Sequence, residues 1–183
     1  LTLRKSLQAA FRARGRVAAI FSPTGLDSAA ETPLGATSFS NEVWMATTER
    51  ELVPPRAQPL KFKVITDDSD IDQAVKIFAD AYTSDASGVG YTSLPPEYSQ
   101  AFRRGLARSH QFVSMHLLGL DAMRPVSVAS VFFSNKAAGI YNVAVLRSAQ
   151  RRGYGSHISF EAAATAFRLG AQSCFLQTEP NGV

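Results

Sequence analysis

Cysteine is almost absent from this sequence, because the 183 residues contain only Cys174. A single cysteine excludes an internal disulfide framework and a zinc site built from several cysteines. The three histidines show no metal-ligand spacing, so no metal site is predicted. Cys174 lies within an apolar run, where it is expected to be a small buried hydrophobe rather than a nucleophile.

Long hydrophobic runs are also missing. No apolar stretch approaches the roughly 18 residues that a membrane-spanning helix needs, although 45% of the residues are hydrophobic. Neither a membrane segment nor a secretory signal is predicted. The composition is typical of a globular protein with a sizeable core, and the cytoplasm is the expected location.

A strong excess of charge is lacking too, since the formal net charge is only +4. The arginines form three groups, and two of these have no interleaved aromatic residues, which is typical of solvated helix faces. We therefore predict no nucleic-acid partner from them. The third group, Arg151 and Arg152, differs because it lies beside glycines.

Prolines mark a division of the chain. Residues 52–59 contain three prolines, which favours extended backbone and predicts an interdomain linker. Residues 1–51 are predicted to form part of an α/β unit, and residues 60–183 a second domain. The pattern helix, glycine, strand, Pro-x-Gly occurs in both, ending at Gly25 and at Gly182. We interpret the first unit as a partial, degenerate duplicate of the second.

The hydrophobic patterns after the linker alternate between those of strands and those of helices. Asp67 is predicted to cap the first helix, and Pro96 to open the second. The three central strands should be antiparallel neighbours, because a short turn at residues 133–139 predicts a hairpin. The order is β-α-α-β-β-β-α-β, with strands expected at residues 60–64, 111–118, 126–133, 140–146 and 173–178 and helices at 67–82, 95–107 and 156–169.

The most informative stretch joins the apolar strand at 139–146 to the helix at 156–169. The first turn of a helix has amide N–H groups without intrahelical partners and carries partial positive charge, so it favours anions. Gly153 and Gly155 would let the backbone approach a phosphate closely. A dinucleotide fingerprint would need a third glycine where Ile158 stands, and a P-loop would need a lysine after the second glycine. The remaining pattern is Gln-x-x-Gly-x-Gly.

This loop, in its strand–loop–helix setting, resembles the signature of the GNAT acetyltransferase superfamily, and the resemblance covers roughly residues 60–183. It implies an α/β (α+β) fold with a mixed, largely antiparallel central sheet flanked by helices. It also implies acetyl-CoA as co-substrate, with the loop amides at the pyrophosphate and the preceding strand along the pantetheine arm. Carried over, it implicates Val143 and Val145 through their backbones, Gln150, Arg151, Arg152, Gly153, Tyr154, Gly155 and Ser156 at the phosphates, and Asn181 as a further contact.

The reaction that the resemblance implies is direct attack of an amine on the acetyl thioester. A base must accept the amine proton, and an acid can protonate the departing thiolate. The candidates are Glu179, at the end of the last predicted strand, and Tyr141, on the strand expected opposite. In the family a tyrosine acid often lies in a further helix, which would fall after Val183, and two more strands would follow. His116 is expected to be structural.

Two other functions stay open from the sequence. A chain with a degenerate first unit and no identified acid or base could be a non-catalytic acyl-CoA-binding or regulatory module. A third hypothesis is an α/β domain that binds another phosphate compound, or RNA, through Arg151 and Arg152. The acceptor amine is not identified, and a homodimer is left open.

Overall fold

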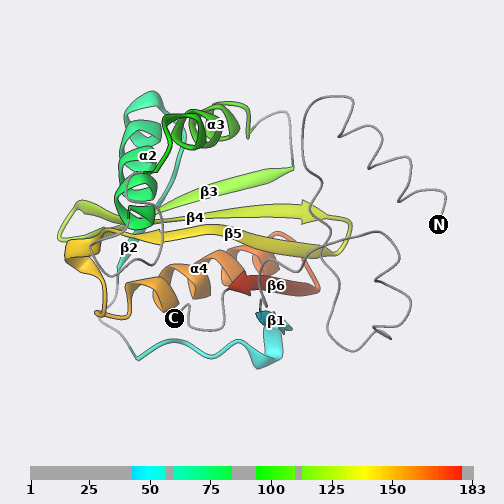
Figure 1. Ribbon diagram of the computed structural model, residues 1–183. Helices are drawn as coiled ribbons and strands as arrows, with labels where there is room; N and C mark the ends of the chain where they lie inside the picture. Colours follow the sequence, from blue (N-terminus) through cyan, green and yellow to red (C-terminus); the bar gives the residue numbers. More distant parts are fainter. Residues whose placement is uncertain (1–42, 57–59, 84–93, 110–112, 179–183) are drawn as a thin grey trace, which may run out of the picture. The chain divides into compact units, whose positions relative to one another are not determined.

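A computed structural model describes residues 43–56, 60–83, 94–109 and 113–178 of the chain (Figure 1). These residues all belong to one compact unit, Ser40–Val183. The predicted helices and strands of residues 1–42, and the proposed duplication of residues 1–51, fall almost entirely outside the described residues. The interpretation of that segment therefore stays a prediction.

The described residues form a six-stranded mixed sheet flanked by helices, which confirms the predicted fold class. The strand order is β1-β6-β5-β4-β3-β2. All neighbours are antiparallel except β5 and β6, which are parallel. The strands are β1 (Val43–Thr47), β2 (Lys61–Val64), β3 (Ser114–Asp121), β4 (Arg124–Ser134), β5 (Ala137–Val145) and β6 (Ser173–Thr178).

The three central strands are antiparallel neighbours, as predicted. β4 and β5 are longer than the sequence indicated, and β3 lies three residues further along the chain. β3 and β4 continue to a two-residue turn at Ala122 and Met123, which both have positive φ, 44° and 68°. Such a turn matches the twist of a hairpin. It was not predicted because glycine and asparagine, the residues that normally mark it, are absent from these positions.

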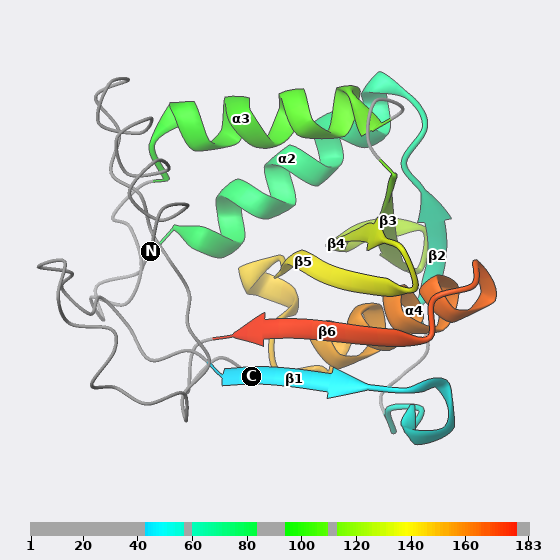
Figure 2. The ribbon, with the colours of Figure 1, turned by 90° about the vertical axis from the view of Figure 1, so that its right-hand side faces the viewer.

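Helices cover both faces of the sheet (Figure 2). α2 (Asp68–Tyr82) and α3 (Pro96–Ala107) pack on one face, where Leu118, Val128 and Ala144 contribute to the core. α4 (Tyr154–Arg168) packs on the other, against residues that include Leu117, Val131 and Ile140. Short 3₁₀ helices occur at Glu49–Glu51 and Arg147–Ala149.

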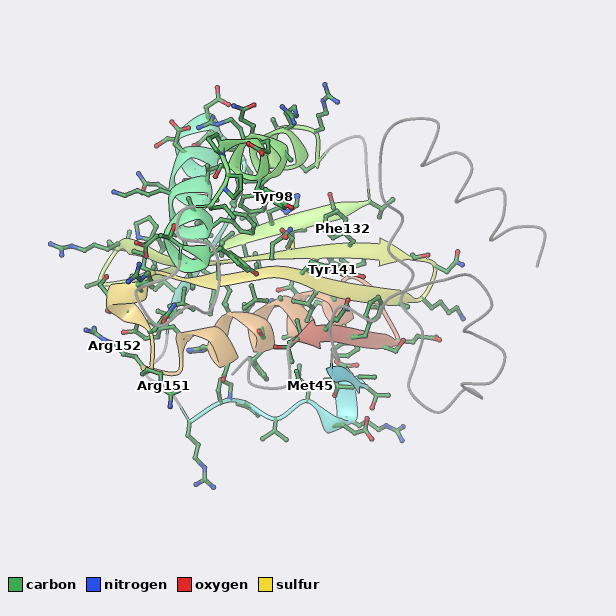
Figure 3. All side chains as sticks on the ribbon, viewed as in Figure 1. Met45, Tyr98, Phe132, Tyr141, Arg151 and Arg152 are labelled. Atoms are coloured by element: carbon green, nitrogen blue, oxygen red, sulfur yellow. The ribbon has the colours of Figure 1, made fainter. Side chains whose placement is uncertain are left out.

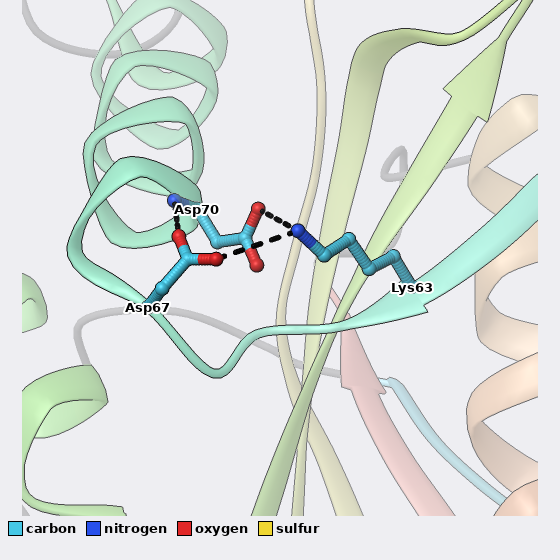
Figure 4. Close-up of polar contacts among 3 residues, drawn as sticks. All are labelled: Lys63, Asp67 and Asp70. Carbon is cyan, nitrogen blue, oxygen red and sulfur yellow. Dashed lines mark hydrogen bonds and ion pairs between the residues drawn. The ribbon is translucent and has the colours of Figure 1, made fainter.

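The start of α2 is fixed by polar contacts (Figure 4). The Asp67 side chain accepts a hydrogen bond from the Asp70 amide at 2.8 Å, which confirms the predicted cap. Lys63 of β2 forms ion pairs with both aspartates, at 3.6 Å and 2.8 Å. The hydrogen bond from the Asp70 amide lowers the pKa of Asp67, and the bond to Asp70 raises the pKa of Lys63. These contacts link β2 to the helix that follows it.

The first described strand differs from the predicted division of the chain. The sequence assigned residues 43–47 to a unit before the linker, whereas β1 pairs with β6 along its length, from Val43 opposite Thr178 to Thr47 opposite Cys174. Without β1, the outer edge of β6 would present unpaired backbone groups. Residues 52–56 contain no helix or strand, and Leu52 packs against the α4 side of the core. The proline-rich segment thus connects two parts of one sheet.

Candidate functional site

The sheet opens between its two parallel strands. β5 and β6 pair from Ala137 opposite Ser173 to Ile140 opposite Leu176, and the pairing stops there although both strands continue. Beyond this point the register between β4 and β5 shifts. Asn142 lies at the shift with a φ of 53°, a conformation that asparagine tolerates better than most residues. This bulge turns β5 away from β6 and leaves a gap in the sheet.

The backbone of β5 beyond the bulge has one side free of β4. The Leu146 amide donates to the Val126 carbonyl, so Leu146 faces β4. Since backbone groups alternate along an antiparallel strand, those of Val143 and Val145 face the opening. The Val145 carbonyl there accepts a hydrogen bond from Gln150 Nε2 at 3.3 Å. An extended ligand could therefore pair with this strand.

The turn after β5 presents amide groups at the N-terminus of α4. Arg151 and Gly153 both have left-handed backbone, with φ of 63° and 79°. Such turns can direct successive N–H groups toward one point, and the first-turn amides of α4 lack intrahelical acceptors. The Arg151 and Arg152 side chains are exposed at this end of the sheet (Figure 3). A left-handed arginine is uncommon and costs backbone strain, which is typical of functional loops.

Two of the side chains predicted to contact phosphate instead form hydrogen bonds within the protein. The Tyr154 side chain is 2% exposed, and its hydroxyl donates to Asp121 Oδ2 at 2.9 Å. Tyr154 can therefore offer only its backbone to an anion. Gln150 joins the loop to β5 through its bond to Val145. At Gly155 an added Cβ would lie 3.8 Å from Val145 Cγ2, an ordinary contact.

Two cavities border the opening of the sheet. The α3 cavity, of about 260 Å³, lies between the helices α2 and α3 and the strands β3 to β5. Its wall includes Phe78, Tyr98, Phe102, Gly105, His116, Phe132 and Asn142. The α4 cavity, of about 220 Å³, lies between α4 and the strands β1, β5 and β6, and includes Ser156, Phe160 and Leu176. Asn142 lines the first and Ile140 the second, so the two cavities contact β5 on either side of Tyr141.

Comparison with known proteins identifies the family. A family model described as an acetyltransferase (GNAT) domain matches residues 46–177, which include the opening of the sheet and the loop before α4. The chain belongs to the GNAT acetyltransferase family. The match confirms the resemblance seen in the sequence, and it extends to residues before the proline-rich segment. A search of curated proteins found no significant match.

Several solved GNAT structures have the same fold. A GCN5-related N-acetyltransferase from Kribbella flavida has a TM-score of 0.56 and 22% identity, and the match covers 77% of this chain and 49% of that one. An N-acetyltransferase from Thermoplasma acidophilum, in complex with coenzyme A, has a TM-score of 0.53 and 11% identity over 68% and 82% of the two chains. A GNAT acetyltransferase from Brucella melitensis, in complex with acetyl-CoA, has a TM-score of 0.51 and 14% identity over 64% and 75%. The present chain spans about half the length of the Kribbella protein.

Tyr141, one of the two predicted catalytic residues, lies in this GNAT domain within a row of rings across the sheet. Its ring contacts Phe132 of β4 at 5.7 Å and Phe175 of β6 at 6.0 Å, both edge-on. Figure 3 shows Tyr98 on α3, and Phe132 and Tyr141 on the strands of the sheet. Glu179 and Asn181 lie outside the described residues, so their positions in the site stay predictions.

The GNAT domain also contains a buried polar group that sequence reasoning treated as structural. His116 of β3 is 3% exposed and lines the α3 cavity. Its Nδ1 lies 2.8 Å from Ser130 Oγ, and the same hydroxyl accepts a hydrogen bond from Asn142 Nδ2 at 3.2 Å. Burial lowers the pKa of His116 from 6.5 to about 4, so the ring is neutral near pH 7. No local pattern in the sequence indicated this hydrogen-bonded group, because its three residues come from three different strands. His116 also has apolar neighbours in the sequence, which favoured a structural interpretation.

The other titratable candidates have structural surroundings. His157 Nδ1 accepts the Leu60 amide at 3.3 Å, and its ring contacts Phe62 at 5.3 Å. Cys174 is 1% exposed and burial raises the pKa of its thiol to about 11, so it is the buried hydrophobe that the sequence predicted. Within the described ranges, no three His, Cys, Asp or Glu side chains gather as metal ligands. Over the same ranges, none of the helices is both long and apolar enough to cross a bilayer.

Proposed function

We propose that this chain is an acetyl-CoA-dependent N-acetyltransferase that acetylates a primary amine by direct attack. The observation that carries the proposal is the loop before α4, where left-handed Arg151 and Gly153 precede unpaired first-turn amides. Family membership supports acetyl transfer, and relatives with the same fold bind coenzyme A or acetyl-CoA. The amine acceptor is our inference from the Gln-x-x-Gly-x-Gly loop and the opening beside it.

The loop before α4 and the open edge of β5 match two parts of acetyl-CoA, the pyrophosphate and the pantetheine arm. The amides of Tyr154, Gly155 and Ser156, with the arginines beside them, would hold the pyrophosphate. The backbone groups of Val143 and the amide of Val145, which face the opening, would pair with the amides of the pantetheine arm, as one strand pairs with another. Such pairing would direct the thioester toward the bulge at Asn142. The α3 cavity would then admit the acceptor from the opposite face of the sheet.

The reaction requires little beyond positioning of the amine and the thioester and transfer of protons. The amine nitrogen bonds to the acetyl carbon, the carbon–sulfur bond breaks, and the amine proton must leave while the thiolate gains one. A backbone amide near the bulge would stabilise the negative charge on the carbonyl oxygen. Tyr141, half-buried beside the opening, and Glu179 are our proposed proton-transfer residues.

A thiol-release assay tests the proposal. A thiol-reactive dye measures free CoA when acetyl-CoA and a panel of primary amines are added. We expect release that depends on the amine. Gly155→Glu should abolish it by placing a carboxylate among the phosphates, whereas the matched Gly155→Ala should retain it, since its Cβ makes only the ordinary contact with Val145. Acetyl-CoA binding without amine-dependent release would favour the regulatory module instead, and release unaffected by Gly155→Glu would contradict the proposed loop.

A further inference from the structure

His116, which lines the α3 cavity, has one polar atom with no partner, the ring nitrogen Nε2. It is one of three side-chain atoms in the described residues that are buried without a hydrogen bond. The other ring nitrogen is engaged by Ser130. A buried imidazole nitrogen normally has a partner, because losing its water without replacement is unfavourable. A ligand in the cavity is a natural source of that partner.

The hydrogen bonds around Ser130 are coupled to the protonation of Nε2. Asn142 Nδ2 can only donate, so the Ser130 oxygen accepts from it. A hydroxyl can accept and donate at once, so Ser130 either donates to Nδ1 or accepts from Nδ1–H. In the second tautomer, Nε2 carries no hydrogen and is an acceptor. The ring is neutral near pH 7, so it does not repel a cation. An amine or ammonium N–H is the matching donor.

Four of the other wall residues are aromatic. Phe78 and Phe102 stack with their centroids 4.3 Å apart, and Phe132 contacts His116 edge-on at 5.8 Å. None of the described residues that line the cavity is charged. Such rings bind an aromatic group by stacking and one ammonium by cation–π attraction. A second cation or a carboxylate on the ligand would find no oppositely charged partner among the described wall residues.

We propose that His116 Nε2 accepts a hydrogen bond from the acceptor amine, and that the α3 cavity selects aralkyl monoamines, in which one amine is carried on an aromatic ring. The inference rests on the acetyltransferase function proposed above and names its acceptor class. It makes His116 a specificity-determining residue, connected through Ser130 to Asn142 at the opening of the sheet.

Steady-state kinetics with the full chain and acetyl-CoA test this inference. The acceptors are 2-phenylethylamine and, as a dication, 1,5-diaminopentane. His116→Phe keeps an aromatic ring but removes both nitrogens, whereas His116→Gln retains an amide oxygen as acceptor. Ser127→Ala is the matched control, since Ser127 Oγ is also buried and unpartnered but lies outside the cavity.

We expect wild-type protein to prefer 2-phenylethylamine to the diamine in kcat/KM. His116→Phe should raise KM for 2-phenylethylamine about tenfold to a hundredfold, the range for a lost hydrogen bond to a charged group. The KM for acetyl-CoA should stay within about twofold, because no phosphate contact changes. His116→Gln should recover part of the loss, and Ser127→Ala should leave both KM values near those of the wild type.

Preference for the diamine, or an unchanged acceptor KM in His116→Phe, would overturn the inference. If neither amine gives thiol release, calorimetric binding of 2-phenylethylamine separates the two proposals. Binding to wild type that is lost in His116→Phe would support the acceptor site while contradicting the catalytic function. No binding to wild type would overturn the acceptor site itself.

Discussion

Gly105 of α3 offers a variant in which stability and acceptor binding should change in opposite directions. The residue lines the α3 cavity, yet a Cβ built on it meets no atom within 4 Å. A larger side chain therefore has free room at the cavity wall. Gly105→Ala should stabilise the protein by about 0.5–1 kcal/mol, because alanine loses less backbone entropy in a helix. Gly105→Leu should likewise fold without loss of stability.

The leucine should nevertheless impair acceptor use. Crowding a ligand in a packed site costs about 1–3 kcal/mol, which corresponds to roughly a 5- to 150-fold rise in the acceptor KM. Urea unfolding gives the stability, and thiol release gives KM for the amine and for acetyl-CoA. Gln100→Leu is the control, as an exposed position of α3 outside the cavity wall. A Gly105→Leu protein with wild-type amine KM would refute the assignment of this cavity to the acceptor.

Two further predictions concern stability. Burial lowers the pKa of His116 from 6.5 to about 4, so the unfolded chain binds more protons between these values. The free energy of unfolding should then fall by up to about 3 kcal/mol as pH drops from 6.5 to 4. If the free energy of unfolding of His116→Phe depended on pH as strongly as that of the wild type, this prediction would be wrong. Gly119→Ala should cost about 1–3 kcal/mol, since its Cβ would lie 2.3 Å from Ser127 Oγ. The double variant with Ser127→Ala should recover part of this loss of stability. If the two changes in the free energy of unfolding, measured with urea, were strictly additive, the contact between residues 119 and 127 would be excluded.

The element order and the loop before α4 could be predicted because local sequence determines them. Gly153 permits the left-handed backbone of the turn, and the apolar stripe of the helix fixes its buried face. The helix was expected to end at residue 169, and Gly170 has a φ of 98° directly after the last turn. Asp67 capped α2 as expected because a side chain and an amide three residues apart suffice. Each of these signals lies within a few residues of its effect.

The α3 cavity and the pairing of β1 could not be predicted, because they depend on contacts between distant segments. His116, Ser130 and Asn142 meet only after three strands take their register, and the bulge at Asn142 shifts that register. The aromatic wall has a faint sequence signal, in that Tyr98 and Phe102 are four residues apart on one helix face. Nothing in residues 43–47 indicates that their partner strand begins at Ser173.

Calorimetric titration of acetyl-CoA, CoA and NADH into the full chain tests the central claim most directly. We predict micromolar binding of acetyl-CoA and CoA and none of NADH, because the loop lacks the third glycine of a dinucleotide site and its amides fit one pyrophosphate beside an open strand edge. Gly155→Glu should abolish the binding and Gly155→Ala should retain it. Absence of acetyl-CoA binding, or equal binding of NADH, would contradict the account of this site.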